Sequence, residues 1–319
     1  MKAATRRKYG PPSIIQIEDT AKPIPTGNEL LVRVTATTVN RTDCANLTAK
    51  PFVMRFVQGM LRPKRPTMGT DFAGVVEAVG EGVRNFSIGD AVFGFNDLGL
   101  QSQATYCIVP EAMAYQKPDN IDFNQAAASV EGAHYAYTFI QKTNIKAGQK
   151  VLINGATGAI GSALLQFVRR YDVHISATAD TDNIDIIRSL GADTVIDYTR
   201  EDILDTNVTY DYVFDAVGKS TFGKCKSILT KKGIYISSEP GPYIQNVFYA
   251  LLTNWFGSRT VIFPIPYPTK ESIPFIIQSL EEGGFKPLID RIYPLEKIAA
   301  AYAYVLTGKK TGNVLISMT

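Results

Sequence analysis

Three glycines stand at three-residue intervals between an apolar strand-like run and a helix-like run. The stretch is VLINGATGAIGSALLQFVRRY, residues 151–171, and it contains Gly155, Gly158 and Gly161. Glycines at this point let the chain turn tightly, let a phosphate approach bare backbone and let the helix pack closely on the strand. The free N–H groups at the start of that helix attract an anion. The spacing therefore predicts a dinucleotide pyrophosphate site, against the alternative that the glycines serve only close packing.

An acidic residue follows where a dinucleotide site needs one. Asp180 comes directly after the next strand-like run, HISATA, and Asp182 follows within ADTDN. Carboxylates accept hydrogen bonds from a free ribose diol and repel a 2′-phosphate, which slightly favours NADH over NADPH. Two alternatives stay open. Asp182 can serve as a helix N-cap, and Lys309, Lys310 or Arg200 can fold over the site and neutralise it.

The elements that must position these residues differ between the two halves of the chain. Up to about residue 125, short strand-like runs alternate with Gly, Pro and Asp, which is typical of a barrel-like or sandwich-like β unit. From about 145 to 265, strand-like and helix-like runs alternate, which predicts a parallel sheet covered by helices. The tail, 266–319, contains two helix-like runs and a last strand-like run, and we expect it to complete the first domain.

Composition limits the function classes. The 319 residues are 45% hydrophobic, enough for two cores, and the 33 Lys and Arg against 30 Asp and Glu are scattered, so we expect no nucleic-acid partner. Three distant cysteines and two histidines support neither a disulfide framework nor a structural zinc site. The N-terminus leads into no apolar signal region, and no apolar run approaches the ~18 residues of a membrane span. We therefore expect a cytoplasmic protein with no membrane partner.

Six sequence blocks are distributed over nearly the whole chain: ELLVRVTATTVNRTD, GTDFAGVVEAVGEGVRNFSIGDAVFGF, VLINGATGAIGS, SLGADTVIDYTRED, YDYVFDAVG and TGKKTGNVLI. In their residues and their order, these blocks resemble the zinc-free, quinone-oxidoreductase-like branch of the medium-chain dehydrogenase/reductases. The resemblance implies an α/β protein with two domains. A GroES-like β-barrel-type substrate domain comprises 1–121 and 266–319, and a Rossmann domain with a doubly wound parallel sheet, which binds the dinucleotide, comprises 122–265.

The same resemblance implies NAD(P)H as the cofactor and a homodimer as the assembly. Family members commonly join Rossmann sheets edge to edge, and the segment 247–265 offers an apolar helix-like run and an apolar strand. The alternative is that this segment is buried within one chain. The residues that the resemblance assigns to the cofactor are Gly155, Ala156, Thr157, Gly158, Ala159, Ile160, Gly161, Asp180, Thr181, Asn183, Tyr198, Ala216, Val217, Gly218, Ser237, Ser238, Ile262 and Phe263.

The positions that bind catalytic zinc in one subgroup of the family carry other residues. Where that subgroup reads Cys-Gly-Thr-Asp this chain reads NRTD, with Asn40 at the cysteine, and Thr70 replaces the histidine of Gly-His-Glu. Because catalytic zinc needs about three protein ligands, no metal is expected. Without zinc to polarise a simple carbonyl, quinones and α,β-unsaturated carbonyls are the easier hydride acceptors. The alternatives are a nicotinamide-binding sensor or partner protein with little turnover, and an alcohol-dehydrogenase-type activity.

Catalytic candidates come from two short stretches. NRTD supplies Asn40 and Asp43, and SVEGAHYAY supplies Glu131, His134 and Tyr135. Asn40 is a candidate hydrogen-bond donor to the substrate or to the nicotinamide ribose, whereas Asp43 can instead cap a turn. An imidazole can donate a proton at neutral pH, although a single histidine is more often structural. The expected catalytic set is Asn40, His134 and Tyr135.

Overall fold

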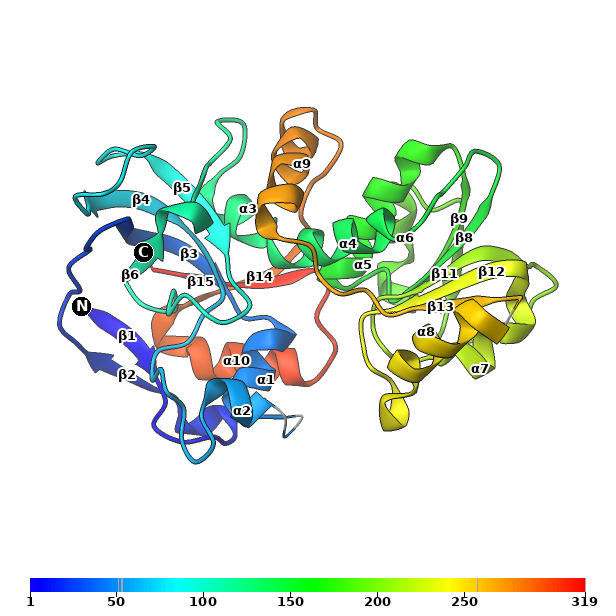
Figure 1. Ribbon diagram of the computed structural model, residues 1–319, viewed down its shortest axis with the longest axis horizontal. Helices are drawn as coiled ribbons and strands as arrows, with labels where there is room; N and C mark the ends of the chain where they lie inside the picture. The colour runs from blue at the N-terminus through cyan, green and yellow to red at the C-terminus, as the bar shows by residue number, and fades with distance from the viewer. Residues whose placement is uncertain (51, 53, 257, 319) are drawn as a thin grey trace. The chain divides into compact units, whose positions relative to one another are not determined.

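The structure, a computed structural model, describes residues 1–50, 52, 54–256 and 258–318. The chain divides into two units. Unit 1 comprises Met1–Glu131, Ile273–Glu281 and Lys286–Thr319, and unit 2 comprises Gly132–Ser272 and Glu282–Phe285. Each unit is organised around its own β-sheet (Figure 1).

Unit 2 contains a six-stranded sheet in the order β10-β9-β8-β11-β12-β13, and every neighbouring pair in it is parallel. Its strands are β8 (Lys150–Asn154), β9 (His174–Ala179), β10 (Thr194–Asp197), β11 (Tyr210–Asp215), β12 (Leu229–Ser237) and β13 (Thr260–Ile262). The chain order reverses direction between β8 and β11, the place where doubly wound sheets bind their ligands. The expected α/β fold class with a doubly wound parallel sheet is confirmed.

Helices join most of these strands, as is usual for parallel pairing: α5 (Ala159–Val168) lies between β8 and β9, α6 (Ile184–Ser189) between β9 and β10, α7 (Phe222–Cys225) between β11 and β12, and α8 (Gln245–Phe256) between β12 and β13. Helix α4 (Glu131–Gln141) precedes β8, and α9 (Thr269–Glu281), most of which belongs to unit 1, follows β13. The sequence pattern predicts a helix over 221–233. The observed helix α7 is shorter, because Leu229 is already the first residue of β12. Leu229 is buried and pairs with Tyr210 of β11. Burial in the sheet therefore outweighs local helix propensity here.

Unit 1 contains a seven-stranded sheet in the order β14-β15-β3-β4-β5-β7, with β6 paired to β3, and a separate β1-β2 pair. Its strands are β1 (Lys2–Thr5), β2 (Gln16–Asp19), β3 (Glu29–Thr38), β4 (Asp71–Val79), β5 (Ala91–Phe95), β6 (Tyr106–Pro110), β7 (Tyr115–Gln116), β14 (Ile289–Pro294) and β15 (Asn313–Ser317). Figure 1 shows β15, in red, beside β3, in blue, so the end of the chain completes the sheet that its first third begins.

Apolar residues of β3 and β4 form a core on one side of this sheet. Leu30, Val32 and Val34 of β3 pack with Phe72 and Val76 of β4, as the alternation of apolar and polar residues along a half-buried strand predicts. The helices of this unit are α1 (Arg41–Thr48), α2 (Met54–Gln58), α3 (Phe123–Ala128) and α10 (Ile298–Leu306).

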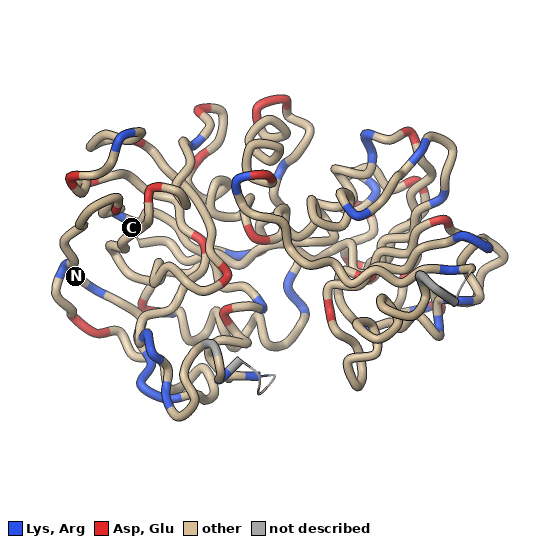
Figure 2. The backbone as a smooth tube through the Cα atoms, in the orientation of Figure 1, with Lys and Arg blue, Asp and Glu red and all other residues tan. Residues whose placement is uncertain are grey.

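Charged residues of both signs are distributed along the backbone of both units (Figure 2). The formal net charge is +3. In the part of the chain that the structure describes, no helix combines the length and the apolar character needed to span a membrane.

Candidate active site

The glycine turn joins the end of β8 to the start of α5. Gly155 has a φ of +85°, which only glycine adopts without strain. A Cβ atom on Gly161 would lie 2.1 Å from the carbonyl oxygen of Gly155, so the helix packs directly on the turn. A Cβ atom on Gly158 would meet only that same oxygen, at 3.5 Å, so the space beside Gly158 is open. Bare backbone is therefore accessible at the N-terminus of α5, as a phosphate site requires.

The other residues assigned to the cofactor lie where the parallel strands end. Asp180 directly follows β9, Tyr198 follows β10 and Ala216 follows β11, whereas Ser237 and Ile262 are the last residues of β12 and β13. The carboxyl ends of neighbouring parallel strands meet at one edge of a sheet. The structure thus brings these predicted residues together at the edge of the sheet that carries the glycine turn.

Asp180 is held in place by local hydrogen bonds. Its Oδ1 atom accepts from the backbone nitrogen of Asn183 at 3.1 Å and from the side-chain Nδ2 of Asn183 at 2.6 Å. The hydroxyl of Tyr198 donates to Oδ2 at 3.4 Å. Asp180 is therefore the cap of the short helix that follows it, and the alternative that assigned this role to Asp182 is wrong. Oδ2 retains capacity to accept a hydrogen bond from a ribose hydroxyl.

A buried carboxylate at the start of the DAVG segment, Asp215, organises the turn after β11. Asp215 is fully buried and accepts from the backbone nitrogen of Gly218 at 2.9 Å and of Ser220 at 3.1 Å. The hydroxyl of Tyr235 donates to the same carboxylate at 2.9 Å. Asp215 therefore fixes the DAVG segment, which carries three of the expected cofactor residues.

Two further polar residues extend this network to the glycine turn. Asn154 Nδ2 donates to Asp215 Oδ1 at 3.1 Å, and Thr178 Oγ1 donates to Asn154 Oδ1 at 3.0 Å. The backbone nitrogen of Gly155 donates to Thr178 Oγ1 at 2.8 Å. One chain of hydrogen bonds thus links both turns. The sequence signal that would have found it is a polar residue at the end of each apolar strand.

In unit 1, Asn40 stands at the start of α1. Its backbone nitrogen donates to Asp43 Oδ2 at 2.9 Å, so Asn40 is the N-cap and Asp43 completes the capping box, in agreement with the capping alternative for Asp43. The side-chain nitrogen of Asn40 donates to Thr38 Oγ1 at 2.8 Å and to Asp71 Oδ2 at 2.7 Å. These bonds fix the amide, and a donor role toward a substrate would require Asn40 to exchange one of them.

Asp43, Asp71 and Glu131 form a group of buried carboxyl groups around Asn40. Thr42 Oγ1 donates to Glu131 Oε1 at 2.5 Å. Burial raises the pKa of Asp43 to about 7 and that of Glu131 to about 8, and the charge of Asp43 adds to the second shift. The pKa of Asp71 is raised well above its usual value by burial and by the charge of Glu131. Protonated carboxyl groups are therefore available here near neutral pH.

His134 lies on α4 in unit 2 and is only 1% exposed. Its Nδ1 atom is 2.7 Å from Ser272 Oγ, and its ring centroid is 5.4 Å from that of Tyr135. Burial lowers the pKa of His134 to about 4. The imidazole is thus neutral at pH 7, which favours the structural alternative; a catalytic role for His134 or Tyr135 stays a prediction.

The described residues at the positions that bind zinc in one subgroup of the family do not fit a zinc centre. Among the described residues, no three His, Cys, Asp or Glu side chains gather in an arrangement that could hold a metal ion. Asn40 and Thr70, at the ligand positions of the zinc-binding subgroup, are an amide and a hydroxyl, and the amide nitrogen of Asn40 already donates to Asp71.

The doubly wound sheet, the open glycine turn and the acid after β9 define a dinucleotide-binding protein of the Rossmann class. Comparison with known proteins narrows this class. A family model described as alcohol dehydrogenase GroES-like domain matches residues 26–119, and one described as zinc-binding dehydrogenase matches residues 190–316. The chain belongs to the medium-chain dehydrogenase/reductase family, in its quinone-oxidoreductase-like branch, as the sequence blocks indicated.

Individual relatives support this assignment. The chain is 30% identical to the NADPH-dependent alkenal/one oxidoreductase, chloroplastic, of Arabidopsis thaliana, over 99% of this chain and 79% of that protein. It is 29% identical to the 2-methylene-furan-3-one reductase of Solanum lycopersicum, with the same coverage of 99% and 79%. The solved quinone oxidoreductase from Coxiella burnetii is 25% identical, with a TM-score of 0.89 over 100% of this chain and 99% of that one.

Proposed function

We propose that this protein is an NAD(P)H-dependent oxidoreductase that transfers a hydride to a quinone or to an α,β-unsaturated carbonyl compound. The open space beside Gly158, at the N-terminus of α5 and at the carboxyl edge of the sheet, is the observation that carries the proposal. Three relatives support the class of acceptor: an alkenal/one oxidoreductase, a 2-methylene-furan-3-one reductase and a quinone oxidoreductase of Sus scrofa.

The residues of unit 2 fit a nicotinamide dinucleotide. When bound, the cofactor supplies the hydride. The glycine turn would hold its pyrophosphate through backbone N–H groups, and Asp180 would accept hydrogen bonds from the adenosine ribose. Ser237 and Phe263, at the ends of β12 and β13, would lie near the nicotinamide. The network through Asp215 positions the two turns and makes no contact with the cofactor in this assignment.

We propose that catalysis does not use zinc. The residues at the ligand positions, Asn40 and Thr70, do not provide a zinc site. A conjugated acceptor spreads the negative charge that develops after hydride transfer, so it needs less stabilisation from the protein than a simple carbonyl does. This distinction favours enones and quinones over the alcohol-dehydrogenase alternative.

We propose Glu131, rather than His134, as the group that holds the proton for the reduced product. An effective general acid has a pKa near the working pH. The pKa of Glu131 is raised to about 8 by burial, whereas that of His134 is lowered to about 4. Thr42 fixes one oxygen of Glu131, and Thr70 Oγ1 lies 3.5 Å from the other.

The cofactor preference that we propose is NADH over NADPH, by a small margin. Asp180 presents a carboxylate at the ribose position, and Asp182 next to it is exposed. Both repel a 2′-phosphate. Arg200 could offset this repulsion, but its Nε atom is 3.4 Å from Asp197 Oδ2 and therefore already has an acidic partner. Relatives with a named cofactor include an NADPH-dependent enzyme, two structures solved with NADPH and an NAD-dependent alcohol dehydrogenase, and the two carboxylates would set this chain apart from those that use NADPH.

We also propose a homodimer that joins two copies of unit 2 through β13 and α8. β13 is the last strand of its sheet, and α8 exposes Phe248, Leu251 and Leu252. An unpaired strand edge beside exposed apolar side chains is a common interface between copies of one chain. Light scattering is expected to give twice the chain mass of 35.0 kDa, and a particle of 35.0 kDa at all concentrations would exclude the dimer.

The proposed activity is tested by following oxidation of NADH and NADPH across a panel of quinones, enones and simple ketones. We expect turnover with the conjugated acceptors and little with the simple ketones. Cofactor binding without turnover on any acceptor would instead indicate a nicotinamide-binding sensor.

A further inference from the structure

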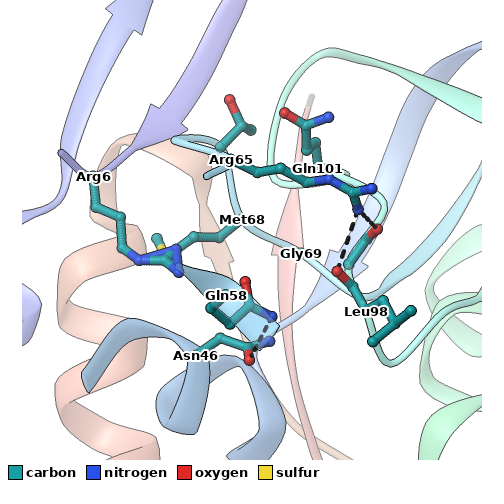
Figure 3. Close-up of a pocket in the computed structure, with 10 residues that line it drawn as sticks. Arg6, Asn46, Gln58, Arg65, Met68, Gly69, Leu98 and Gln101 are labelled. Carbon is teal, nitrogen blue, oxygen red and sulfur yellow. Dashed lines mark hydrogen bonds between the residues drawn. The ribbon is translucent and has the colours of Figure 1, made fainter. Parts of the chain in front are cut away.

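A small hollow in unit 1 contains a buried arginine whose guanidinium makes no hydrogen bond or ion pair with the described residues. Its lining includes Arg6, Asn46, Gln58, Arg65, Met68 and Gly69, and its empty volume is about 280 Å³, part of it open to solvent. Figure 3 shows the guanidinium of Arg6 extending into this hollow toward Met68 and Gln58. Only a small part of this volume is enclosed, so the hollow suits a small group rather than a large ligand.

Arg6 lacks the polar partners that Arg7 and Arg65 have, and Arg55, which faces the same Tyr9 ring, also has an Nε atom buried without a hydrogen bond. Its residue is 2% exposed, and its Nε atom is buried without a hydrogen bond. By contrast, Arg7 Nη2 lies 3.1 Å from Glu18 Oε1, and Arg65 Nη1 donates to the carbonyl oxygen of Gly99 at 2.8 Å. Within the described part of the chain, Arg6 makes neither an ion pair nor a hydrogen bond through its guanidinium, and its centre lies 5.7 Å from the ring of Tyr9.

The groups that face Arg6 do not neutralise it. Tyr9, Tyr302 and Asp43 act on it only through longer-range charge interactions, and the largest influence on Arg6 is burial, which lowers its pKa. An arginine nevertheless stays charged in a protein. A buried charge without a partner is strongly unfavourable, so its presence here indicates a ligand that supplies the opposite charge.

The remaining lining mixes polar side chains with Met68 and Leu98, and it contains no acidic residue among the residues described around the hollow. Asn46 Oδ1 accepts from Gln58 Nε2 at 3.1 Å, and this bond leaves the amide hydrogens of Asn46 unused. A negatively charged group in the hollow would thus meet the guanidinium of Arg6 and an amide donor, with Arg65 at the rim.

We propose that this hollow is a carboxylate-binding subsite in which Arg6 binds a monocarboxylate, either the acid group of the conjugated carbonyl substrate or a free small acid. The planar guanidinium matches a carboxylate through two parallel hydrogen bonds. A single buried arginine balances the single charge of a carboxylate, whereas a phosphate would bring more charge into the same small volume.

The part of this inference that concerns the substrate rests on the proposed function. Asn46 is on α1, which begins after Asn40, and six residues of helix span about 9 Å. Gly69 directly precedes Thr70 and Asp71. Asp71 is one of the buried carboxyl groups around Asn40, and Thr70 contacts another of them, Glu131. In this proposal a short enone acid has its carboxylate at Arg6 and its conjugated carbonyl directed along α1 toward Asn40, within unit 1.

Arg6→Met is the main test, because methionine keeps much of the side-chain volume and removes the charge. Arg7→Met is the matched control, since Arg7 is the next residue and is exposed. The probes are 4-oxopent-2-enoate and its methyl ester. The measured quantity is kcat/KM for the acid divided by kcat/KM for the ester. We expect this ratio to fall roughly tenfold to a hundredfold in Arg6→Met, because a charge-assisted bidentate contact is lost. The ratio should stay unchanged in Arg7→Met. The melting temperature of Arg6→Met should not fall, because the variant removes an unpaired buried charge.

Sodium acetate provides a second arm that needs no turnover. At constant ionic strength, with chloride as the reference anion, acetate should raise the melting temperature of the wild type and of Arg7→Met but not of Arg6→Met. An acetate effect without an acid-over-ester preference identifies a free acid as the ligand, and it supports the subsite even if no quinone or enone is reduced. If neither the acetate effect nor the acid preference depends on Arg6, the subsite is excluded. Should Arg6→Met fail to fold, Arg6→Lys retains the charge, loses the bidentate geometry and carries the same comparison.

Discussion

Substituting two glycines of the same turn should separate cofactor binding from stability. At Gly158, φ is −76°, and the Cβ of an alanine would meet only the carbonyl oxygen of Gly155, at 3.5 Å. Alanine is less favourable than glycine at a helix N-cap by a few tenths of a kcal/mol or more, but it also restricts the unfolded chain by about 0.4–1 kcal/mol. The two effects nearly cancel. We expect Gly158→Ala to change the free energy of unfolding by less than about 1 kcal/mol.

The same methyl group occupies the space that we assign to the pyrophosphate. Gly158→Ala should therefore weaken NADH and NADPH binding at least roughly tenfold, which corresponds to about 1.4 kcal/mol. Gly161→Ala is the contrasting variant, because its Cβ would lie 2.1 Å from Gly155 O and 2.8 Å from Ala156 Cα. Backbone atoms must shift to relieve that clash, and we expect a loss of about 1–3 kcal/mol of stability.

The assay combines urea unfolding of each variant with titration of NADH and NADPH, followed by nicotinamide fluorescence. Gly158→Ala should unfold at the wild-type urea concentration and bind cofactor weakly, whereas Gly161→Ala should unfold earlier. Wild-type affinity in a normally folded Gly158→Ala would refute the assignment of the pyrophosphate to this turn.

Three further predictions concern protons and cofactor choice. Glu131→Gln should lower the rate on an enone by roughly 10²–10⁴ and that on a quinone less, while His134→Ala should cost under about tenfold; equal losses in both variants would remove Glu131 from its role. The pKa of Glu131 rises from 4.5 to about 8 on folding, so the folded protein binds more protons between these values and the stability contributed by this group falls as pH rises. Between pH 5 and 8, the melting temperature of Glu131→Gln should therefore fall less, or rise more, with increasing pH than that of the wild type. Parallel curves for the two proteins would contradict this. The lowered pKa of His134 acts in the opposite direction, but it does so equally in both proteins. Asp180→Ser combined with Asp182→Lys should shift preference toward NADPH by about 1–3 kcal/mol, measured as the ratio of kcat/KM values, and an unchanged ratio would place cofactor choice elsewhere.

Sequence patterns predicted those helices, strands and turns whose local sequence, in apolar runs and turn residues, matches their burial in the fold. The glycine turn and the strands on either side of Asp180 have both apolar runs and turn residues, so their positions could be read directly. The helix predicted after Thr221 ends early, because Leu229 is needed in the sheet beside Tyr210. Local propensity carries no information about that tertiary contact.

The buried polar groups were harder to predict, since their partners are distant in sequence. Asp71 lies 31 residues from Asn40, and Asn154 lies 61 residues from Asp215, yet each pair is hydrogen-bonded. In the sequence, Arg6 is one of several basic residues in TRRK, and only its burial in the fold distinguishes it from Arg7. Spacing identifies a turn, whereas the environment of a titratable side chain depends on the assembled fold.

Transfer of label from the cofactor to a conjugated acceptor tests the central claim most directly. NADH and NADPH carrying deuterium at C4 of the nicotinamide would be incubated with the protein and an enone, and the saturated product analysed by mass spectrometry and NMR. Direct hydride transfer predicts one deuterium at the β-carbon of the product. This deuterium should come from one of the two C4 positions of the nicotinamide, and the proton at the α-carbon should come from water. Cofactor that binds and stays reduced, or a reduced product without label, would contradict direct hydride transfer by this protein.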